Sequence, residues 1–471
     1  MNKRLLTGIL GRFLQIYALL ILLPAGLTLL YSENPVNFYL FVGSSAASLI
    51  IGTAMTKYGA TGEPSVQEAM FLTVAGWILA IIIGALPLAY YLPTFDAFFE
   101  AASGLTTTGI SLMANPETMP NSILMWRSFM QWIGGLGILT FFIAVIRKSG
   151  GVSQRLFSAE AHKTDPGSIR PSLLKSVKDL WRVYAFLTTV LIGLLVALEM
   201  PVFDAVVHAF STLSTGGFST QAESFAALTP EIQALMTIFM LVGGINFVII
   251  YRVLKADYRP LAENTELKAY LAMFFVLAGI LVYDFMGKTS MPLLDGLFQS
   301  AAFVSSTGFS TLDISITMPA VQLILLAVLF TGGSLGSTSG GFKTFRAVAM
   351  IKLLKARLRS YSLPKSAVNA VKIDGELIEN SAIKTMSVLF FAWITFAFIV
   401  AILLVGLEGY SFKGAISVAF SSLGNMGPTF IEGSLIEASV ASKILIAVSM
   451  VAGRLEMLPL LAVFNTKIFN D

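Results

Sequence analysis

A polar turn that contains a glycine occurs four times in this chain, and its residue types suit the binding of a dehydrated cation. No residue of these turns carries a charge, so a cation there would be held by main-chain carbonyls and hydroxyls. Glycine permits the backbone angles that turn carbonyls toward one axis, and rings of carbonyls replace an ion's hydration shell in potassium pores. Aligned on their glycines, the four copies are Thr107-Thr108-Gly109, Thr215-Gly216-Gly217, Ser306-Thr307-Gly308 and Asn425-Met426-Gly427.

The four copies differ in detail, and the differences predict a site that is not fully symmetric. The first three carry an aspartate thirteen residues before the glycine, at Asp96, Asp204 and Asp295, and the fourth does not. The fourth also has no hydroxyl side chain just before its glycine. For one copy alone, close helix packing would be the better interpretation of the small residues. Four copies in equivalent places favour four equivalent segments around one pore axis.

A second polar segment, residues 331–341, interrupts a long apolar stretch that runs from 317 to 358. It follows the third turn closely enough to lie beneath it, near the middle of the membrane. A flexible loop at that depth would obstruct the path and could move, so we expect a gate; a helix kink that serves packing is the alternative. The residues expected to form the gate are Gly332, Gly333, Ser334, Gly336, Ser337, Thr338, Ser339, Gly340 and Gly341.

Arg454 lies near the centre of the last apolar stretch, where a cation is costly unless it faces a partner or a cavity. We expect it to bind carbonyls of the 331–341 loop and to act as a barrier to cations below the turns. A structural ion pair with Glu456 is an alternative that is compatible with these roles. Acidic residues outside the turns are expected to concentrate cations, and the candidates are Glu100, Glu117, Glu223 and Asp313.

The composition indicates an integral membrane protein. Of 471 residues, 56% are hydrophobic and only 12% are charged, which is too little charge to cover a soluble surface of this size. The absence of cysteine excludes disulfides and thiol nucleophiles. The sequence contains no Walker motif, no dinucleotide fingerprint and no cluster of catalytic acids or histidines. We therefore expect that the chain is not an enzyme and that it binds no cofactor.

Apolar windows of about twenty residues predict the membrane spans that must position the turns. Each turn follows a shorter apolar stretch, such as 95–105, which as a helix would reach about 16 Å, half of the hydrocarbon core. A re-entrant helix fits this length, because irregular backbone at that depth must be buried in protein or line a path. The ten expected spans lie near 5–31, 37–57, 66–91, 121–147, 179–200, 230–254, 267–287, 317–358, 383–407 and 437–468.

The fold expected from these windows is an all-α polytopic membrane protein with four pseudo-symmetric units around one pore. Each unit consists of a span, a pore helix, a turn and a second span, and two further spans precede the first unit. The expected boundaries are 1–60 for the two leading spans and 61–150, 151–260, 261–372 and 373–471 for the four units, the third with a broken second span.

Basic residues gather in the loops on the side away from the turns, which predicts the orientation. By the positive-inside rule these loops are cytoplasmic, the turns open outward and, with an even number of spans, both termini are cytoplasmic. Anionic membrane lipid or nucleic acid could bind such loops, but topology and a docking surface are favoured, and no nucleic-acid partner is expected. The basic residues are Arg147, Lys148, Arg155, Lys163, Arg170, Lys175, Lys178, Arg252, Lys255, Arg259, Lys343, Arg346, Lys352, Lys355, Arg357, Arg359, Lys365 and Lys372.

Five segments resemble motifs of the Trk/Ktr/HKT superfamily of potassium transporters. The resemblance extends from about residue 66 to the C-terminus, and the two leading spans are similar to those of its TrkH/TrkG branch. The segments are TTTGI at 106–110, QWIGGLG at 131–137, STGGFST at 214–220, GGSLGSTSGGFK at 332–343 and GRLE at 453–456.

The resemblance implies a potassium uptake pore in the plasma (inner) membrane of a bacterium or archaeon, with K⁺ as the transported ion. It also implies a homodimer in which each protomer has its own pore and the 331–341 loop is an intramembrane gate. A cytosolic ring of TrkA-like subunits, which bind ATP, ADP or NAD, would dock on the inner face and control opening. Plant relatives that transport sodium carry serine at the first glycine, so Gly109 favours potassium. Sodium- or proton-coupled symport is the alternative to a channel-like pore.

Overall fold

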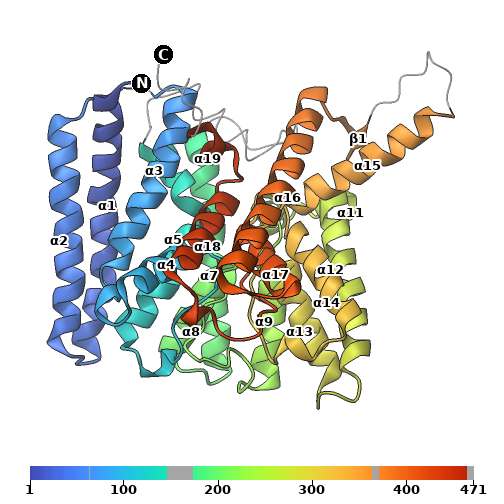
Figure 1. The fold of residues 1–471 in the computed structure, drawn as a ribbon, viewed down its shortest axis with the longest axis horizontal. Coiled ribbons are helices and arrows are strands. Elements are labelled where there is room, and N and C mark those ends of the chain that lie inside the picture. Colours follow the sequence, from blue (N-terminus) through green and yellow to red (C-terminus); the bar gives the residue numbers. More distant parts are fainter. Residues whose placement is uncertain (63, 146–172, 363–370, 464–471) are drawn as a thin grey trace.

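The computed structural model describes residues 1–62, 64–145, 173–362 and 371–463, in which nearly all secondary structure is helical (Figure 1). Within these ranges the strands are β1 (Lys372–Ile373) and β2 (Glu376–Leu377), an antiparallel hairpin in which Lys372 lies opposite Leu377. The all-α class predicted from the sequence is confirmed. The basic residues expected between 147 and 170, and Lys365, lie outside the described residues.

Six of the described helices are long and apolar enough to cross a membrane on their own. Side-chain caps open four of them. In the capping box that opens the third helix, the Ser65 hydroxyl accepts the Glu68 N–H, and the Glu68 carboxylate accepts the Ser65 N–H. The six helices are α1 (Lys3–Leu30), α2 (Pro35–Tyr58), α3 (Val66–Ala85), α7 (Leu173–Ala197), α12 (Thr265–Phe285) and α16 (Asn380–Glu408).

Helices α1 and α2 form a closely packed pair at one side of the molecule (Figure 1). A β-carbon on Gly11 would lie 2.6 Å from the carbonyl oxygen of Gly52, so the two backbones touch at their crossing. The Ser48 hydroxyl adds a hydrogen bond of 2.8 Å to the Leu14 carbonyl. Small residues allow this approach, which drives helix association in lipid, where no hydrophobic force acts between helices. Small residues thus hold α1 and α2 together as a pair, which lies beside the part of the fold that carries the four turns (Figure 1).

Four shorter helices of 12 or 13 residues each lead into one of the four turns. Proline stands just before or at the first position of three of them, at Pro93, Pro201 and Pro292, where its missing N–H costs little. The fourth helix begins after Ser411, whose hydroxyl accepts the Gly414 N–H. These helices are α4 (Thr94–Leu105), α8 (Val202–Leu213), α13 (Pro292–Val304) and α17 (Phe412–Gly424).

The segment 230–254, predicted as one span, is divided into two helices, so a single continuous helix over this range is wrong. Helices α9 (Pro230–Gly243) and α10 (Phe247–Leu254) are bent by 106°. A side chain at Gly244 would overlap the Tyr270 hydroxyl, so this position must be glycine. The Asn246 side chain then accepts the Val248 N–H at 2.8 Å and caps a new helix. By contrast, α5 (Asn121–Val145) is continuous.

Two further apolar stretches are also divided. The stretch 317–358 forms α14 (Pro319–Thr331) and α15 (Thr344–Ser360), with the polar loop between them. The stretch 437–468 forms α18 (Val440–Arg454) and α19 (Leu458–Val463), separated by Leu455, Glu456 and Met457, of which the last two have positive φ. The remaining short helices are α11 (Arg259–Glu263), η1 (Leu88–Tyr90), η2 (Pro116–Thr118), η3 (Ile314–Ile316) and η4 (Leu435–Glu437).

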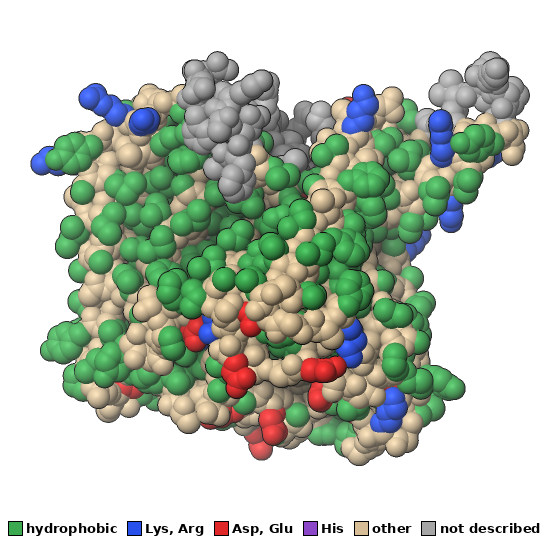
Figure 2. All heavy atoms as spheres, viewed as in Figure 1, with side chains coloured by type: hydrophobic (Ala, Val, Ile, Leu, Met, Phe, Trp, Pro, Cys, Tyr) green, Lys and Arg blue, Asp and Glu red, His purple; other side chains and the backbone are tan. Residues whose placement is uncertain are grey.

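Charged side chains are unevenly distributed between the two ends of the molecule. On the face shown in Figure 2, Lys and Arg line the upper edge, where α15 and the N-terminus lie, and Asp and Glu lie mainly in the lower part, together with some further Lys and Arg side chains. Lys352, Lys355, Arg357 and Arg359 all belong to α15. This distribution suits a membrane protein whose basic end faces the cytoplasm.

Candidate functional site

The four short helices end in the same way, and this cap builds each turn. At the first turn the Thr107 N–H binds the Gly104 carbonyl at 3.0 Å, and the Thr108 N–H binds the Ser103 carbonyl at 2.9 Å. This is a Schellman cap, which requires a left-handed residue just after the helix. The same pair of hydrogen bonds closes the other three helices. The left-handed residues are Thr107 (φ 56°), Thr215 (φ 54°), Ser306 (φ 60°) and Asn425 (φ 50°).

The aligned glycines make a second left-handed position in every turn. Their φ angles are 80° at Gly109, 81° at Gly217, 80° at Gly308 and 100° at Gly427. Glycine adopts this region at no steric cost, whereas any other residue is strained there. All four turns therefore share one backbone conformation, although their side chains differ.

The turns contact one another in a closed ring. A β-carbon on Gly109 would overlap the Gly216 carbonyl oxygen of the second turn. In the same way Gly217 faces the Thr307 carbonyl, and Gly308 faces the Met426 carbonyl. The ring closes at Gly427, where a β-carbon would lie 3.1 Å from the Thr108 carbonyl oxygen. Each glycine thus leaves room for the carbonyl just before the next glycine, and four uncharged turns surround one axis.

Gln131, on α5, supports the second turn from behind. Its side-chain amide donates to the Gly216 carbonyl at 2.6 Å, and its oxygen accepts the Phe218 N–H at 3.2 Å. A β-carbon on Gly216 would lie 2.6 Å from the same side-chain oxygen, so this position must be glycine. Gln131 was not predicted as a site residue, although it begins the 131–137 motif. The second turn therefore has a carbonyl that is already hydrogen-bonded.

Glu100 supports the first turn and does not face the outside, so its predicted role as an exposed cation-concentrating acid is wrong. Its side chain is fully buried on α4 and accepts the Arg127 Nε–H at 2.8 Å. It also accepts the Ser111 hydroxyl at 2.9 Å and the Leu112 N–H at 3.0 Å, just after the first turn. The Arg127 guanidinium lies 4.2 Å from the ring centre of Phe218, which follows the second turn. One buried ion pair thus connects two turns.

Replacing Arg127 with methionine should destabilise the protein strongly, because it leaves the buried Glu100 carboxylate without its counter-charge. Breaking one partner of a buried pair costs about 3–5 kcal/mol. Thermal unfolding in detergent, followed by fluorescence, measures the effect. The matched control is Arg252→Ala in the more exposed Arg252–Asp257 pair, which should shift the unfolding temperature little. Equal shifts for the two variants would contradict the supporting role of the buried pair.

The aspartates that precede the first three turns also stabilise connections around the ring. Asp204 accepts the Thr220 hydroxyl, and Asp295 accepts the Thr311 hydroxyl, both at 2.8 Å. Asp96 instead binds the Lys443 ammonium at 2.7 Å, with both side chains 9% exposed. Lys443 comes from α18, in the part of the chain whose own turn has no aspartate. The asymmetry expected from the sequence thus has a structural counterpart.

The predicted gating segment is a compact loop that leaves α14 and returns to the same point. The Phe342 N–H binds the Phe330 carbonyl at 2.9 Å, and the Lys343 N–H binds the Thr331 carbonyl at 2.8 Å. Positive φ at Gly332 (66°), Gly336 (76°) and Gly341 (80°) shapes the loop. The other predicted members, Gly333, Ser334, Ser337, Thr338, Ser339 and Gly340, lie between these glycines.

The loop lies directly against the helix ends that carry three of the turns. Ser306, the left-handed residue of the third turn, has its hydroxyl 2.6 Å from that of Ser339 and accepts the Gly340 N–H at 2.8 Å. The Thr338 hydroxyl donates to the Leu213 carbonyl at the end of α8 at 2.8 Å. A β-carbon on Gly340 would overlap the Gly424 carbonyl at the end of α17.

Arg454 binds main-chain carbonyls of two separate segments. Its guanidinium donates to the Thr338 carbonyl of the loop at 2.8 Å and to the Gly134 and Gly135 carbonyls of α5 at 2.7 Å each. Glu456 forms an ion pair with Arg346, which favours the loop-binding role of Arg454 over a simple pair with Glu456. The Lys343 ammonium, which was not predicted as a site residue, donates to the Ser339 carbonyl. Two cationic side chains thus bind carbonyls of the loop.

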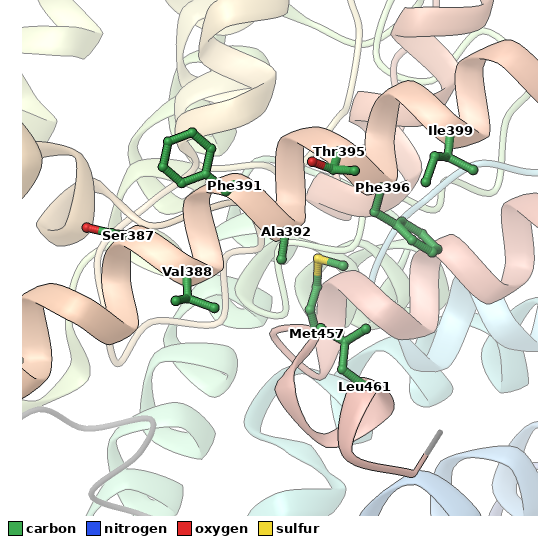
Figure 3. A pocket seen from close by; sticks show the side chains of 9 residues that line it. All are labelled: Ser387, Val388, Phe391, Ala392, Thr395, Phe396, Ile399, Met457 and Leu461. Atoms are coloured by element: carbon green, nitrogen blue, oxygen red, sulfur yellow. The ribbon is translucent and has the colours of Figure 1, made fainter. Parts of the chain in front are cut away.

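An apolar groove of about 520 Å³ lies outside this region, between α16 and the end of the chain described here (Figure 3). It is lined by Phe391, Phe396 and Ile399 of α16 and by Met457 and Leu461, and among its lining residues only Ser387 and Thr395 add hydroxyls. A lining of this kind suits acyl chains and cannot replace the water around a cation. The groove is therefore not part of the cation site.

Apolar spanning helices and a ring of carbonyl-bearing turns at their centre define a multi-pass membrane transport protein. A family model named TrkH and described as cation transport protein matches residues 40–470, and the chain belongs to the TrkH family. Members of this family are transporters and not enzymes, in agreement with the sequence prediction. The resemblance stated from the motifs is thereby confirmed.

Individual relatives match over all or nearly all of their length. An uncharacterized cation transporter of Methanocaldococcus jannaschii is 30% identical over 466 residues, which cover 98% of this chain and 95% of the relative. The Trk system potassium uptake protein TrkH of Salmonella typhimurium is 28% identical, with all of both chains covered. The crystal structure of the potassium transporter TrkH from Vibrio parahaemolyticus has a TM-score of 0.88 at 25% identity, again over all of both chains.

Proposed function

We propose that this chain is the membrane subunit of a potassium uptake system and that potassium loses its water within the ring of four turns. The closed ring of glycine–carbonyl contacts is the observation that carries this proposal. Potassium is named because the Salmonella and Vibrio relatives are potassium transporters. Carbonyl dipoles bind a cation strongly enough to dehydrate it and weakly enough to release it. The filter residues are the twelve of the four turns, from Thr107 to Gly427.

The 332–341 loop is the gate in this proposal, held closed by Ser306, Arg454 and Lys343. Its contacts with the ends of α8, α13 and α17 support this, since a loop in that position fills the space beneath the turns. The exposed acids Glu117, Glu223 and Asp313 are the remaining candidates for concentrating cations outside. The basic end is cytoplasmic, in a bacterial or archaeal plasma membrane. The four units keep the boundaries 61–150, 151–260, 261–372 and 373–471.

The proposed function also implies partners for this chain. The name of the Salmonella relative describes one component of a Trk system, which supports a regulatory subunit for this chain as well. A cytosolic ring of nucleotide-binding subunits on the basic end and a homodimer with two separate pores complete the assembly. Anionic lipid would interact with the basic end.

Rubidium uptake into vesicles tests the function. The purified chain, with its loop intact or with residues 333–340 deleted, is reconstituted into potassium-loaded vesicles, and ⁸⁶Rb⁺ and ²²Na⁺ uptake are compared. We expect rubidium uptake driven by the membrane potential, which supplies about 2.3 kcal/mol per charge per 100 mV, and much slower sodium uptake. Uptake that vanishes without a proton or sodium gradient would establish symport instead. Absence of rubidium uptake in both preparations would overturn the proposal.

A further inference from the structure

The carboxylate of Glu266 binds both ends of the 332–341 loop. Glu266 is the second residue of α12 and is 5% exposed. A single oxygen of its side chain accepts the Leu335 N–H at 2.6 Å and the Phe345 N–H at 3.2 Å. Leu335 lies in the loop, and Phe345 is the second residue of α15, just after the loop. One acid on a neighbouring helix therefore fixes the loop relative to the helix that follows it.

The start of α12 is in turn held by the β1–β2 hairpin. Asp374, in the hairpin turn, accepts the Thr265 N–H at 2.9 Å and also the Thr265 hydroxyl. Its other oxygen lies 3.4 Å from the Asn264 side-chain amide. Asp374 and Gly375 both have positive φ, the conformation of a tight two-residue hairpin turn. The hairpin thus contacts α12 one residue before Glu266.

Apolar contacts connect the same hairpin to the loop. Ile373 of β1 is 4% exposed and belongs to one buried cluster with Leu335, Phe345, Ala349 and Met386. Leu335 and Phe345 are the two residues whose N–H groups bind Glu266. The hairpin is thus connected to them in two ways: through the hydrogen bonds of Asp374 at the start of α12, and through the apolar contacts of Ile373. Figure 1 shows β1 beside α15, at the basic end of the molecule. The hairpin is therefore placed where a cytosolic protein can reach it.

We propose that Glu266 is the positioning residue that keeps the gating loop closed and that the 372–377 hairpin controls it from the cytoplasmic end. The inference rests on the proposed function of the loop as a gate. A buried carboxyl group that loses its hydrogen-bond donors is costly. The loop position that offers both N–H groups is therefore favoured. Displacement of the hairpin removes the Asp374 contacts and loosens the start of α12, and with it the closed loop.

Glu266→Ala should raise basal ⁸⁶Rb⁺ uptake by the reconstituted chain on the order of tenfold, since it removes two hydrogen bonds from the closed state. Glu266→Gln keeps an oxygen that can accept both N–H groups, so its uptake should stay near that of the parent chain. Glu263→Ala, at an exposed acid three residues away on α11, is the matched control and should change nothing. The rubidium-to-sodium ratio should be the same in all variants, because Glu266 does not contact the turns.

A chain without residues 333–340 separates this inference from the proposed gate. In that background Glu266→Ala should have no further effect. If deletion raises uptake and Glu266→Ala in the intact chain does not, the gate stands and the role of Glu266 is overturned. If deletion itself leaves uptake unchanged, the gate assignment fails. Should Glu266→Ala not fold, Asp374→Ala at the exposed hairpin turn replaces it; a two- to threefold rise supports the inference, and unchanged uptake overturns it.

Discussion

Replacing Gly308 with alanine should nearly abolish rubidium uptake. The new β-carbon would overlap the Met426 carbonyl oxygen, and alanine is strained by about 1–2 kcal/mol at a φ of 80°. Relief of the overlap moves a carbonyl of the neighbouring turn out of the ring. An ion that loses one such ligand loses about 3 kcal/mol, and since about 1.4 kcal/mol is a factor of ten, uptake falls on the order of 100-fold.

Two other glycines give this prediction its controls. Gly427→Ala places its β-carbon 3.1 Å from the Thr108 carbonyl oxygen, a close contact without the overlap, so its effect should be milder than that of Gly308→Ala. Gly279→Ala on α12 meets no atom within 4 Å and should transport normally. Uptake is measured per folded protein, with size-exclusion profiles matched. If Gly308→Ala transports as well as Gly279→Ala, the ring is not the ion site.

Deletion of residues 333–340 should raise basal uptake by at least about tenfold, because it removes the material beneath the turns together with the loop's hydrogen bonds. The structure indicates that this deletion should not disturb the flanking helices. A β-carbon on Gly341 would lie 2.8 Å from the Cα of Gly332, so the two flanking residues are already adjacent and can be joined without moving α14 or α15. The rise should appear in the chain alone, without a cytosolic subunit.

Ser337→Ala serves as the control for the deletion. Ser337 is part of the loop but is only partly buried, and its hydroxyl binds within the loop, to the Ser334 carbonyl at 2.6 Å and the Ser339 N–H at 3.3 Å. Its removal should leave basal uptake close to that of the parent. A deleted chain that elutes as the parent does and yet shows only parental uptake would show that the barrier lies elsewhere.

The local features of the site were predictable because they depend on residue types. Gly308 and its three counterparts mark the left-handed positions, and the glycine- and serine-rich run at 332–341 marks where α14 must end. Arg454 could be connected to the loop because a cation in a span needs acceptors, and exposed loop carbonyls are the nearest ones. Each of these inferences needs only a residue's own preference and its depth in the membrane.

What escaped prediction depends on contacts between distant segments. Glu100 looks like an exposed acid unless its pairing with Arg127 of α5 is known, and Glu266 looks like an ordinary first-turn acid of α12. The bend between α9 and α10 had a local signal, a Gly-Gly pair followed by the capping residue Asn246, which resembles the glycine-rich break at 332–341. A hydropathy window does not reveal this bend, because the helices on both sides of it are apolar.

The closed ring of turns has a consequence for how such a protein can change by mutation. In a pore built from four copies of one short chain, every coding change alters all four sides at once. Here the four turns are separate segments of one chain, so one substitution alters only one turn of the ring. Each glycine faces only the next turn, and the disturbance falls mainly on one neighbour. If the ring is the ion site, its preference can therefore change in small steps, and the Asn425-Met426 turn already differs from the other three.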